Sequence, residues 1–169
     1  MLSREKIIEM LQDLEKATEA FNIPPFDIYL MGGSACLLAG YHDRGTRDFD
    51  LVDLHYASGI AKVLVFLREY DLLEYESVAL PPSYRERAAR QEGFDYLNIY
   101  VLSKEDVIVS KIIRMDQRDK EDLDAMVPKA DKAMLNQLID EVLGRDDLFQ
   151  TKKIGFRKGL KQFRERYYV

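Results

Sequence analysis

A chain of 169 residues is long enough for one domain, or for one core with a small appended subdomain. Apolar residues make up 47% of it and charged residues 33%, which is ordinary globular usage and excludes a disordered or fibrous protein. The apolar runs are far shorter than the roughly 20 residues that a membrane span needs, and a single cysteine, Cys36, excludes an internal disulfide. We therefore predict a folded protein of the reducing cytoplasm without a membrane-spanning segment.

Charge is distributed unevenly along the chain. The net charge is −5, yet the last 19 residues, 151–169, carry seven Lys or Arg and one Glu, a balance of +6. Residues 1–150 therefore carry −11. An acidic body with a basic end is the resulting pattern.

The first part of the chain alternates predicted helices and strands. Apolar residues recur at helical spacing from residue 3 to 21, and the run 27–31 then favours a strand that ends at a glycine pair. Acidic and apolar residues alternate with a period of two in 48–53, which is typical of a strand with carboxylates on one face. The expected elements are helices over 3–21, 34–39 and 57–70 and strands over 27–31, 48–53, 72–78 and 96–102, with 81–93 as a loop.

Only helices are predicted beyond residue 103. Ser103 begins a sequence that resembles a capping box, and a helix carrying Lys111 and Arg114 follows it. Further helices are expected over 119–126, 131–143 and 154–168, where proline or glycine ends two of them. The change near residue 103 predicts an α/β core over 1–103 and a C-terminal helical subdomain over 104–169.

The glycine pair is the first candidate for a binding site. Gly32, Gly33 and Ser34 lie between a predicted strand and a predicted helix. Glycines at such a turn let a phosphate approach the backbone, and the helix N-terminus offers N–H donors. The alternative is a tight turn that needs glycine only for its positive φ.

Asp48 and Asp50 are the second candidate. At positions i and i+2 of a strand they project from the same face, roughly 6 to 7 Å apart. Mg²⁺ prefers a few carboxylate oxygens together with phosphate and water, so this spacing suits the protein part of a metal and phosphate site. A solvent-facing edge strand is the alternative explanation.

The two motifs together resemble a known superfamily. The stretch 30–53, LMGGSACLLAGYHDRGTRDFDLVD, is similar to the nucleotidyltransferases related to DNA polymerase β. Their pattern is a hydrophobic strand, Gly-Gly or Gly-Ser, a helix, and then Arg-x-Thr-x-Asp-hydrophobic-Asp, whose last two acids bind Mg²⁺. The matching residues are Gly33, Ser34, Arg44, Thr46, Asp48 and Asp50; Gly32 and Arg47 lie beside them.

A second stretch extends the resemblance. Residues 101–123 look like the segment that follows the core in small bacterial nucleotidyltransferase-like proteins, among them toxins of abortive-infection systems. Lys111, Arg118 and Asp122 fill the positions of a helix-borne lysine and of an Arg-Asp-Lys-x-Asp motif. The lysine could neutralise a triphosphate, or it could lie on a solvated helix face.

One position departs from the superfamily pattern. The superfamily usually supplies a third acid from a neighbouring strand, and the strand expected to carry it contains Asn98, with Asp95 at its edge. Asn98 has no charge and cannot act as a base, whereas Asp95 has the opposite strand parity. Either Asp95 takes part through a shifted strand, or catalysis is weak.

The resemblance implies a fold and a function. The fold is α/β (α+β), with a small mixed β-sheet, flanking helices and the helical subdomain. The function is Mg²⁺-dependent transfer of a nucleoside monophosphate from an NTP to a hydroxyl group of an RNA, a protein or a small molecule. The alternative is a catalytically degenerate nucleotide-binding or regulatory protein, which as half of a toxin–antitoxin pair would have an antitoxin partner.

The basic C-terminal helix has no counterpart in the resemblance. Its apolar residues predict a core-facing stripe, and its Lys and Arg residues are left for solvent. This basic face could bind an RNA acceptor, although a solvated helix face would give the same pattern.

Overall fold

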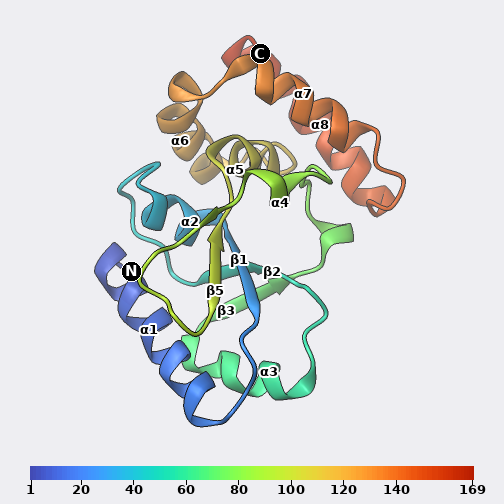
Figure 1. Cartoon of the computed structure of the whole chain (residues 1–169). Helices are drawn as coiled ribbons and strands as arrows, with labels where there is room; N and C mark the ends of the chain where they lie inside the picture. The colour runs from blue at the N-terminus through green and yellow to red at the C-terminus, as the bar shows by residue number, and fades with distance from the viewer. The chain divides into compact units, whose positions relative to one another are not determined.

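The computed structural model describes all residues, 1–169, and the chain divides into two compact units. The α/β unit consists of Met1–Leu73 and Ala88–Leu102, and the helical unit consists of Glu74–Arg87 and Ser103–Val169. Eight α-helices and one five-stranded mixed sheet make up the regular structure (Figure 1). The predicted fold class is therefore confirmed. None of the helices combines the length and the apolar character that crossing a bilayer requires.

The sheet lies entirely within the α/β unit. Its strands are β1 (Asp27–Met31), β2 (Phe49–Val52), β3 (Tyr70–Leu73), β4 (Ala89–Arg90) and β5 (Asn98–Val101). Their order across the sheet is β3-β2-β1-β5-β4. β1 runs antiparallel to β2 and parallel to β5, while β2 and β3 are parallel. The strands before and after the glycine turn are thus neighbours, as their separation by one short helix predicts.

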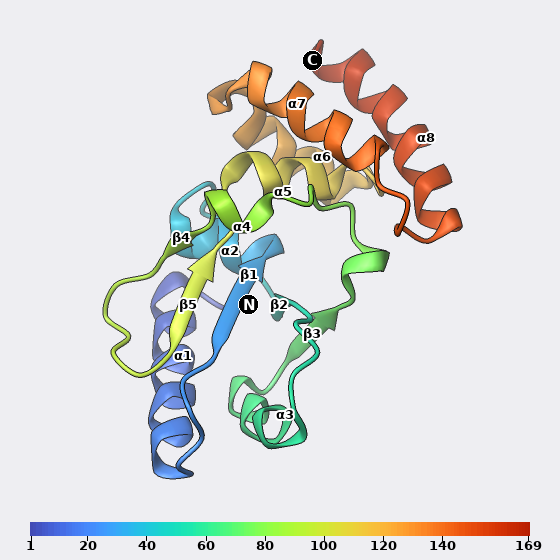
Figure 2. The same ribbon diagram turned by 45° about the vertical axis from the view of Figure 1, so that its right-hand side comes forward.

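Three helices accompany the sheet in this unit. They are α1 (Arg4–Ala20), α2 (Gly32–Ala39) and α3 (Ser58–Leu64). Ser3 caps α1 by accepting a hydrogen bond from the backbone N–H of Lys6. α1 runs alongside the sheet and packs against α2 and α3 (Figure 2), and its residues Ile7, Leu11 and Leu14 are fully buried. The amphipathic pattern of residues 3–21 therefore faces the core.

The expectations between residues 57 and 93 need correction. The helix ends at Leu64 and is followed by a 3₁₀ turn, Val65–Leu67, and the helical path stops at Arg68, whose φ is 64°. The next strand begins at residue 70, not 72, since Tyr70 pairs with Phe49, and it ends at residue 73. Residues 81–93 are not all loop, because they contain α4 (Tyr84–Arg87) and β4.

The helical unit consists of α4 and four longer helices. These are α5 (Lys104–Lys111), α6 (Gln117–Met126), α7 (Lys132–Leu143) and α8 (Gln150–Tyr167). Ser103 caps α5, Asp116 forms a capping box at α6, and Asp131 caps α7. The side chains of Phe156 and Phe163 on α8 are buried, so the apolar stripe of this helix faces the core of the unit, as predicted.

Arg145 fixes residues 74–87 to the rest of the helical unit. Its guanidinium is buried and donates hydrogen bonds to the carbonyl oxygens of Tyr75, Val78 and Leu80 at 2.7 to 3.1 Å. It also lies 3.7 Å from the centre of the Tyr75 ring. A planar cation with several fixed donors suits this role, because it can donate to three carbonyl oxygens of one segment at the same time.

Candidate metal and nucleotide site

Three carboxylates gather on one face of the sheet. Asp48 and Asp50 come from the start of β2, and the third is Asp71 of β3. One oxygen of each lies within 4.8 Å of the others. The strand register explains the proximity, because Asp50 pairs with Asp71 across two parallel strands and directly paired residues project from the same face. This cluster is called the acidic triad below.

The sheet determines how far each acid of the triad is buried. Phe49 and Leu51 alternate with the two acids on β2 and are fully buried on the opposite face. Asp48 and Asp50 are half-buried, and Asp71 is exposed. β2 is also paired on both sides, with β1 and with β3. The explanation of the acid pair as a solvent-facing edge strand is therefore wrong.

The acids of the triad disturb one another electrostatically. Partial burial raises the pKa of Asp48 above its usual value of 3.8, and the negative charges of Asp71 and Glu69 raise it further. Each of these causes disfavours the ionised form of Asp48. A cation placed among the three carboxylates would remove the repulsion, and oxygen ligands of this kind suit a hard divalent ion.

The glycine turn lies directly beside the triad. Gly32 has φ 62°, and a Cβ atom at this position would collide with the Asp50 carboxylate, whose Cγ would be 3.1 Å away. At Gly33 a Cβ atom would lie 2.6 Å from Oγ1 of Thr46. The positive φ is thus a sufficient reason for glycine at position 32, and close approach is a reason at both positions. The turn between β1 and α2 consequently touches the strand that carries the acids.

The hydroxyl groups predicted to bind a nucleotide are engaged with the protein itself. Ser34 is fully buried and donates to the carbonyl oxygen of Met31 at 3.1 Å. Thr46 is buried as well and donates to the carbonyl oxygen of Asp48 at 3.3 Å. Both hydroxyls hold the ends of the strands in place. The N-terminus of α2 has no side-chain cap, so its first-turn N–H groups are the donors that this turn offers to an anion.

Two arginines accompany these residues. Arg44 is half-buried, and its backbone N–H donates to Nδ1 of His42 at 3.2 Å. Arg47 is exposed and directly precedes Asp48. Their positions in the loop that enters β2 bring positive charge close to the acids in sequence.

Asp95 and Asn98 do not join the acidic triad. Asn98 opens β5, pairs with Asp27 at the start of β1, and accepts a hydrogen bond from Arg90 at 3.0 Å. Met31, at the other end of β1, is the residue opposite Asp50. Four residues of strand separate these points, about 13 Å, which is too far for Asn98 and Asp50 to share an ion. Asp95 is exposed and precedes β5.

Lys111, Arg118 and Asp122 lie in the helical unit. The ammonium of Lys111 is 2.9 Å from a carboxylate oxygen of Asp122 and 3.5 Å from one of Asp119. The Lys111 side chain is only 10% exposed, so the explanation as a solvated helix face is wrong. Arg118 is exposed on α6. Within this unit the Arg-Asp-Lys-x-Asp motif supplies two acids that orient the lysine.

Asp71 is the residue that sequence reasoning missed. Glu69 and Asp71 are spaced i and i+2, as Asp48 and Asp50 are, and this repeated acidic spacing was the available signal. The signal was overlooked because the strand was expected to begin one residue after Asp71. Asp71 therefore fell between a helix predicted to end at residue 70 and a strand predicted to begin at residue 72, whereas it lies inside β3.

The sheet, the glycine turn and the acidic triad define a nucleotidyltransferase-type core. A family model described as "Nucleotidyltransferase of unknown function (DUF6036)" matches residues 5–163. The chain belongs to this family, which confirms the resemblance and supports nucleotidyl transfer, with a nucleotide as substrate, as its general activity. Nucleotidyltransferases generally use divalent metals, and the triad could bind one. No curated protein and no solved structure matches the chain significantly.

Proposed function

We propose that this protein transfers a nucleoside monophosphate from an NTP to a hydroxyl acceptor in a Mg²⁺-dependent reaction. The observation that carries the proposal is the acidic triad beside the uncapped N-terminus of α2. It combines oxygen ligands for a metal with backbone donors for phosphate. The three carboxylates lie within 4.8 Å of one another, where a bound cation would offset their mutual repulsion.

The donor set of the triad fits Mg²⁺. All three groups offer carboxylate oxygens, which hard divalent ions prefer, and no thiolate or imidazole is among them. Asp48, Asp50 and Asp71 are the residues that would hold the ion. When bound, Mg²⁺ would neutralise charge on the phosphates of the NTP during the displacement.

The remaining residues of the site would bind and orient the nucleotide. The N–H groups of the partly exposed Gly32 and Gly33 would donate to the outer phosphates at the start of α2, and the buried Ser34 would hold the turn through its bond to Met31. Gly32 would keep this turn against Asp50, and Thr46 would hold the loop that leads to Asp48. These contacts would fix the phosphates before transfer, which is how phosphoryl-transfer enzymes achieve most of their rate.

Cationic residues would complete the nucleotide site. We propose that Arg44 and Arg47 contribute positive charge from the loop before β2. Lys111, Arg118 and Asp122 belong to the helical unit, and their part in nucleotide binding stays a prediction of the sequence. The antitoxin partner and the cytoplasmic location stay predictions of the sequence.

The alternative of a nucleotide-binding protein without catalytic activity loses its main support. It was motivated by an asparagine at the position expected to hold the third acid. Asp71 offers a third carboxylate from a different strand, and a third carboxylate supplies both a metal ligand and a group able to accept a proton. An active enzyme is therefore the better supported alternative.

Labelled nucleotides test the proposal. The protein would be incubated with each α-labelled NTP, Mg²⁺ and a panel of RNA, protein and small-molecule acceptors. We expect transfer of label to one acceptor class with release of pyrophosphate. The variant Asp48→Asn with Asp50→Asn should be inactive, and the matched Asp43→Asn, an exposed acid of the preceding loop, should be active.

Binding is measured in the same preparations. Mg²⁺ with an NTP should raise the melting temperature of the wild type, because a ligand bound only by the folded state stabilises it. The double variant should show no such increase. An equal increase in both proteins would mean that the site is elsewhere, whereas binding without transfer to any acceptor would favour a regulatory nucleotide-binding protein.

A further inference from the structure

A basic surface outside the acidic triad lies on α8. Four cations of this helix, Lys153, Arg157, Lys161 and Arg164, are spaced i, i+4, i+8 and i+11. At 100° per residue they fall within an arc of about 80°, and at 1.5 Å per residue they extend over about 16 Å. We call this row the basic stripe.

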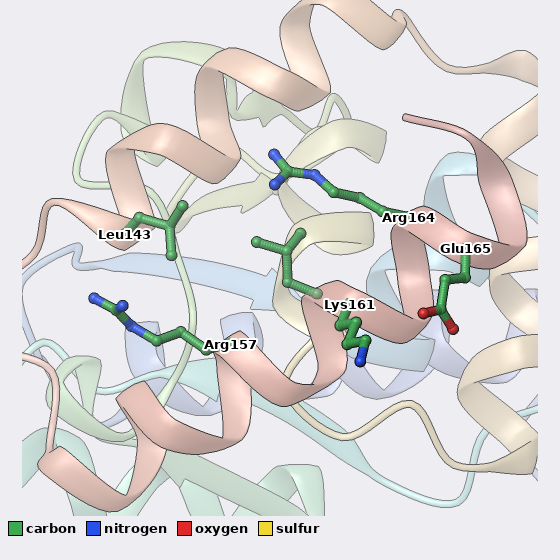
Figure 3. A pocket seen from close by; sticks show the side chains of 6 residues that line it. Leu143, Arg157, Lys161, Arg164 and Glu165 are labelled. Carbon is green, nitrogen blue, oxygen red and sulfur yellow. The ribbon is translucent and has the colours of Figure 1, made fainter.

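The stripe borders an open groove between α7 and α8. The groove has a volume of about 510 Å³ and is lined by Leu143, Arg157, Leu160, Lys161, Arg164 and Glu165. Figure 3 shows the guanidinium groups of Arg157 and Arg164 extending toward the side of Leu143, while Lys161 and Glu165 point away from it. The surface thus combines an apolar floor of two leucines with cationic sides, and Glu165 is its single acid.

The cations of the groove are available to a ligand. Arg157, Lys161 and Arg164 are exposed and make no ion pair within the protein. Arg166, on another face of the same helix, is instead bound to Asp124 at 2.7 Å. The helix therefore separates a cation used for structure, Arg166, from the three groove cations, which make no ion pair within the protein.

We propose that the basic stripe and its groove bind a single strand of RNA. Its length is enough for several successive phosphates of one strand. The cations are spread along a line, which suits an extended polyanion better than a single small anion. Unstacked bases could lie against the leucine floor and on the arginine planes, as they do where proteins recognise single-stranded RNA.

The structure disfavours an anionic membrane as the occupant. A helix that binds a membrane surface inserts its apolar face between lipids. On α8 the aromatic residues of that face, Phe156 and Phe163, are buried in the core of the helical unit, and Leu160 is only 6% exposed at the floor of the groove. Too little apolar surface is left on this helix for insertion between lipids. This proposal concerns a surface separate from the acidic triad and does not depend on transfer chemistry.

Fluorescence anisotropy with a labelled single-stranded RNA 12-mer tests the proposal. Neutralising two stripe cations, Arg157→Gln with Lys161→Gln, should reduce the slope of log affinity against log salt by about 1.4, since each contact with a single strand contributes about 0.7. The same relation predicts an affinity loss of roughly 25-fold at 0.1 M salt. The matched control Lys152→Gln with Lys158→Gln changes the charge of α8 equally, yet neither residue lines the groove. It should bind RNA within about twofold of the wild type.

Several results would overturn the proposal. Equal losses in the two double variants would mean that only net charge matters. Tighter binding of the same sequence as a duplex, or as a deoxy strand, would exclude single-stranded RNA as the occupant. Tighter binding of polyglutamate of equal charge would indicate an acidic protein partner instead. Circular dichroism and melting of each variant would show that all of them are folded.

Discussion

Asp71→Asn is the sharpest test of the acidic triad. We expect the variant to be more stable than the wild type without metal and less stable than the wild type with metal. Two unit charges 4.8 Å apart repel by about 0.9 kcal/mol in water. Asp71 faces two such charges, and salt reduces the sum for these partly exposed groups to about 1 kcal/mol. The variant without metal should therefore melt about 2 to 4 °C higher than the wild type.

Mg²⁺ should reverse this order. At a concentration ten times its dissociation constant, an ion bound only by the folded wild type adds about 1.4 kcal/mol. Asp71→Asn loses one of three carboxylate ligands and should show at most a small part of this gain. The melting curves of the two proteins, measured with EDTA and across a Mg²⁺ titration, should cross.

A matched control separates ligation from general charge. Glu69→Gln removes an acid two residues away, whose charge also raises the pKa of Asp48, but which is not a member of the triad. It should keep the full Mg²⁺ response. The reasoning is refuted if Asp71→Asn responds to Mg²⁺ as the wild type does, or if Glu69→Gln loses the response to the same extent.

Two further substitutions test the turn and the lysine cluster. Gly32→Ala should lower the unfolding free energy by about 1 to 3 kcal/mol in urea, because its φ of 62° and the adjacent Asp50 both oppose a side chain; unchanged stability would contradict the close approach. Asp119→Asn should lower it by about 2 kcal/mol at pH 7. Burial pushes the pKa of Asp119 upward, but the hydrogen bonds from Arg114 and the positive charges of Lys111 and Arg114 together outweigh burial and hold the pKa below 3.8. The contribution of Asp119 is therefore complete above about pH 4 and is lost as the pH falls through its lowered pKa, so the difference from wild type should shrink at pH 3.

Local patterns predicted the parts of the site that lie close together in sequence. The alternation of Asp48, Phe49 and Asp50 depends only on the two-residue period of a strand, so it could be recognised without knowing the sheet. The glycine turn was recognisable for a similar reason, because a strand, two glycines and an apolar helix follow one another directly. The crowding of Gly33 by Thr46 was not, since it arises from the contact between two segments.

The third acid depends on strand order, which local patterns do not contain. β2 has two neighbours, and either could have supplied the acid. The sequence pointed to the strand of Asn98, but β5 lies on the far side of β1 from β2. Asp71 became a neighbour because β3 pairs in parallel with β2, after a helix that ends earlier than its apolar pattern suggests. A two-residue error in the predicted start of a strand was therefore enough to miss the acid that lies beside Asp50.

The acidic triad and the glycine turn are best explained together. Each opposes folding on its own: three carboxylates repel one another, and Gly32 adopts a left-handed conformation and has no side chain to pack. Elsewhere the chain uses its acids for stability, since Asp116 and Asp131 cap helices. Unlike the acids that cap helices, the ionised acids of the triad repel one another. Local conflict of this kind is typical of functional sites, and a bound cation is the simplest means of turning the repulsion into attraction.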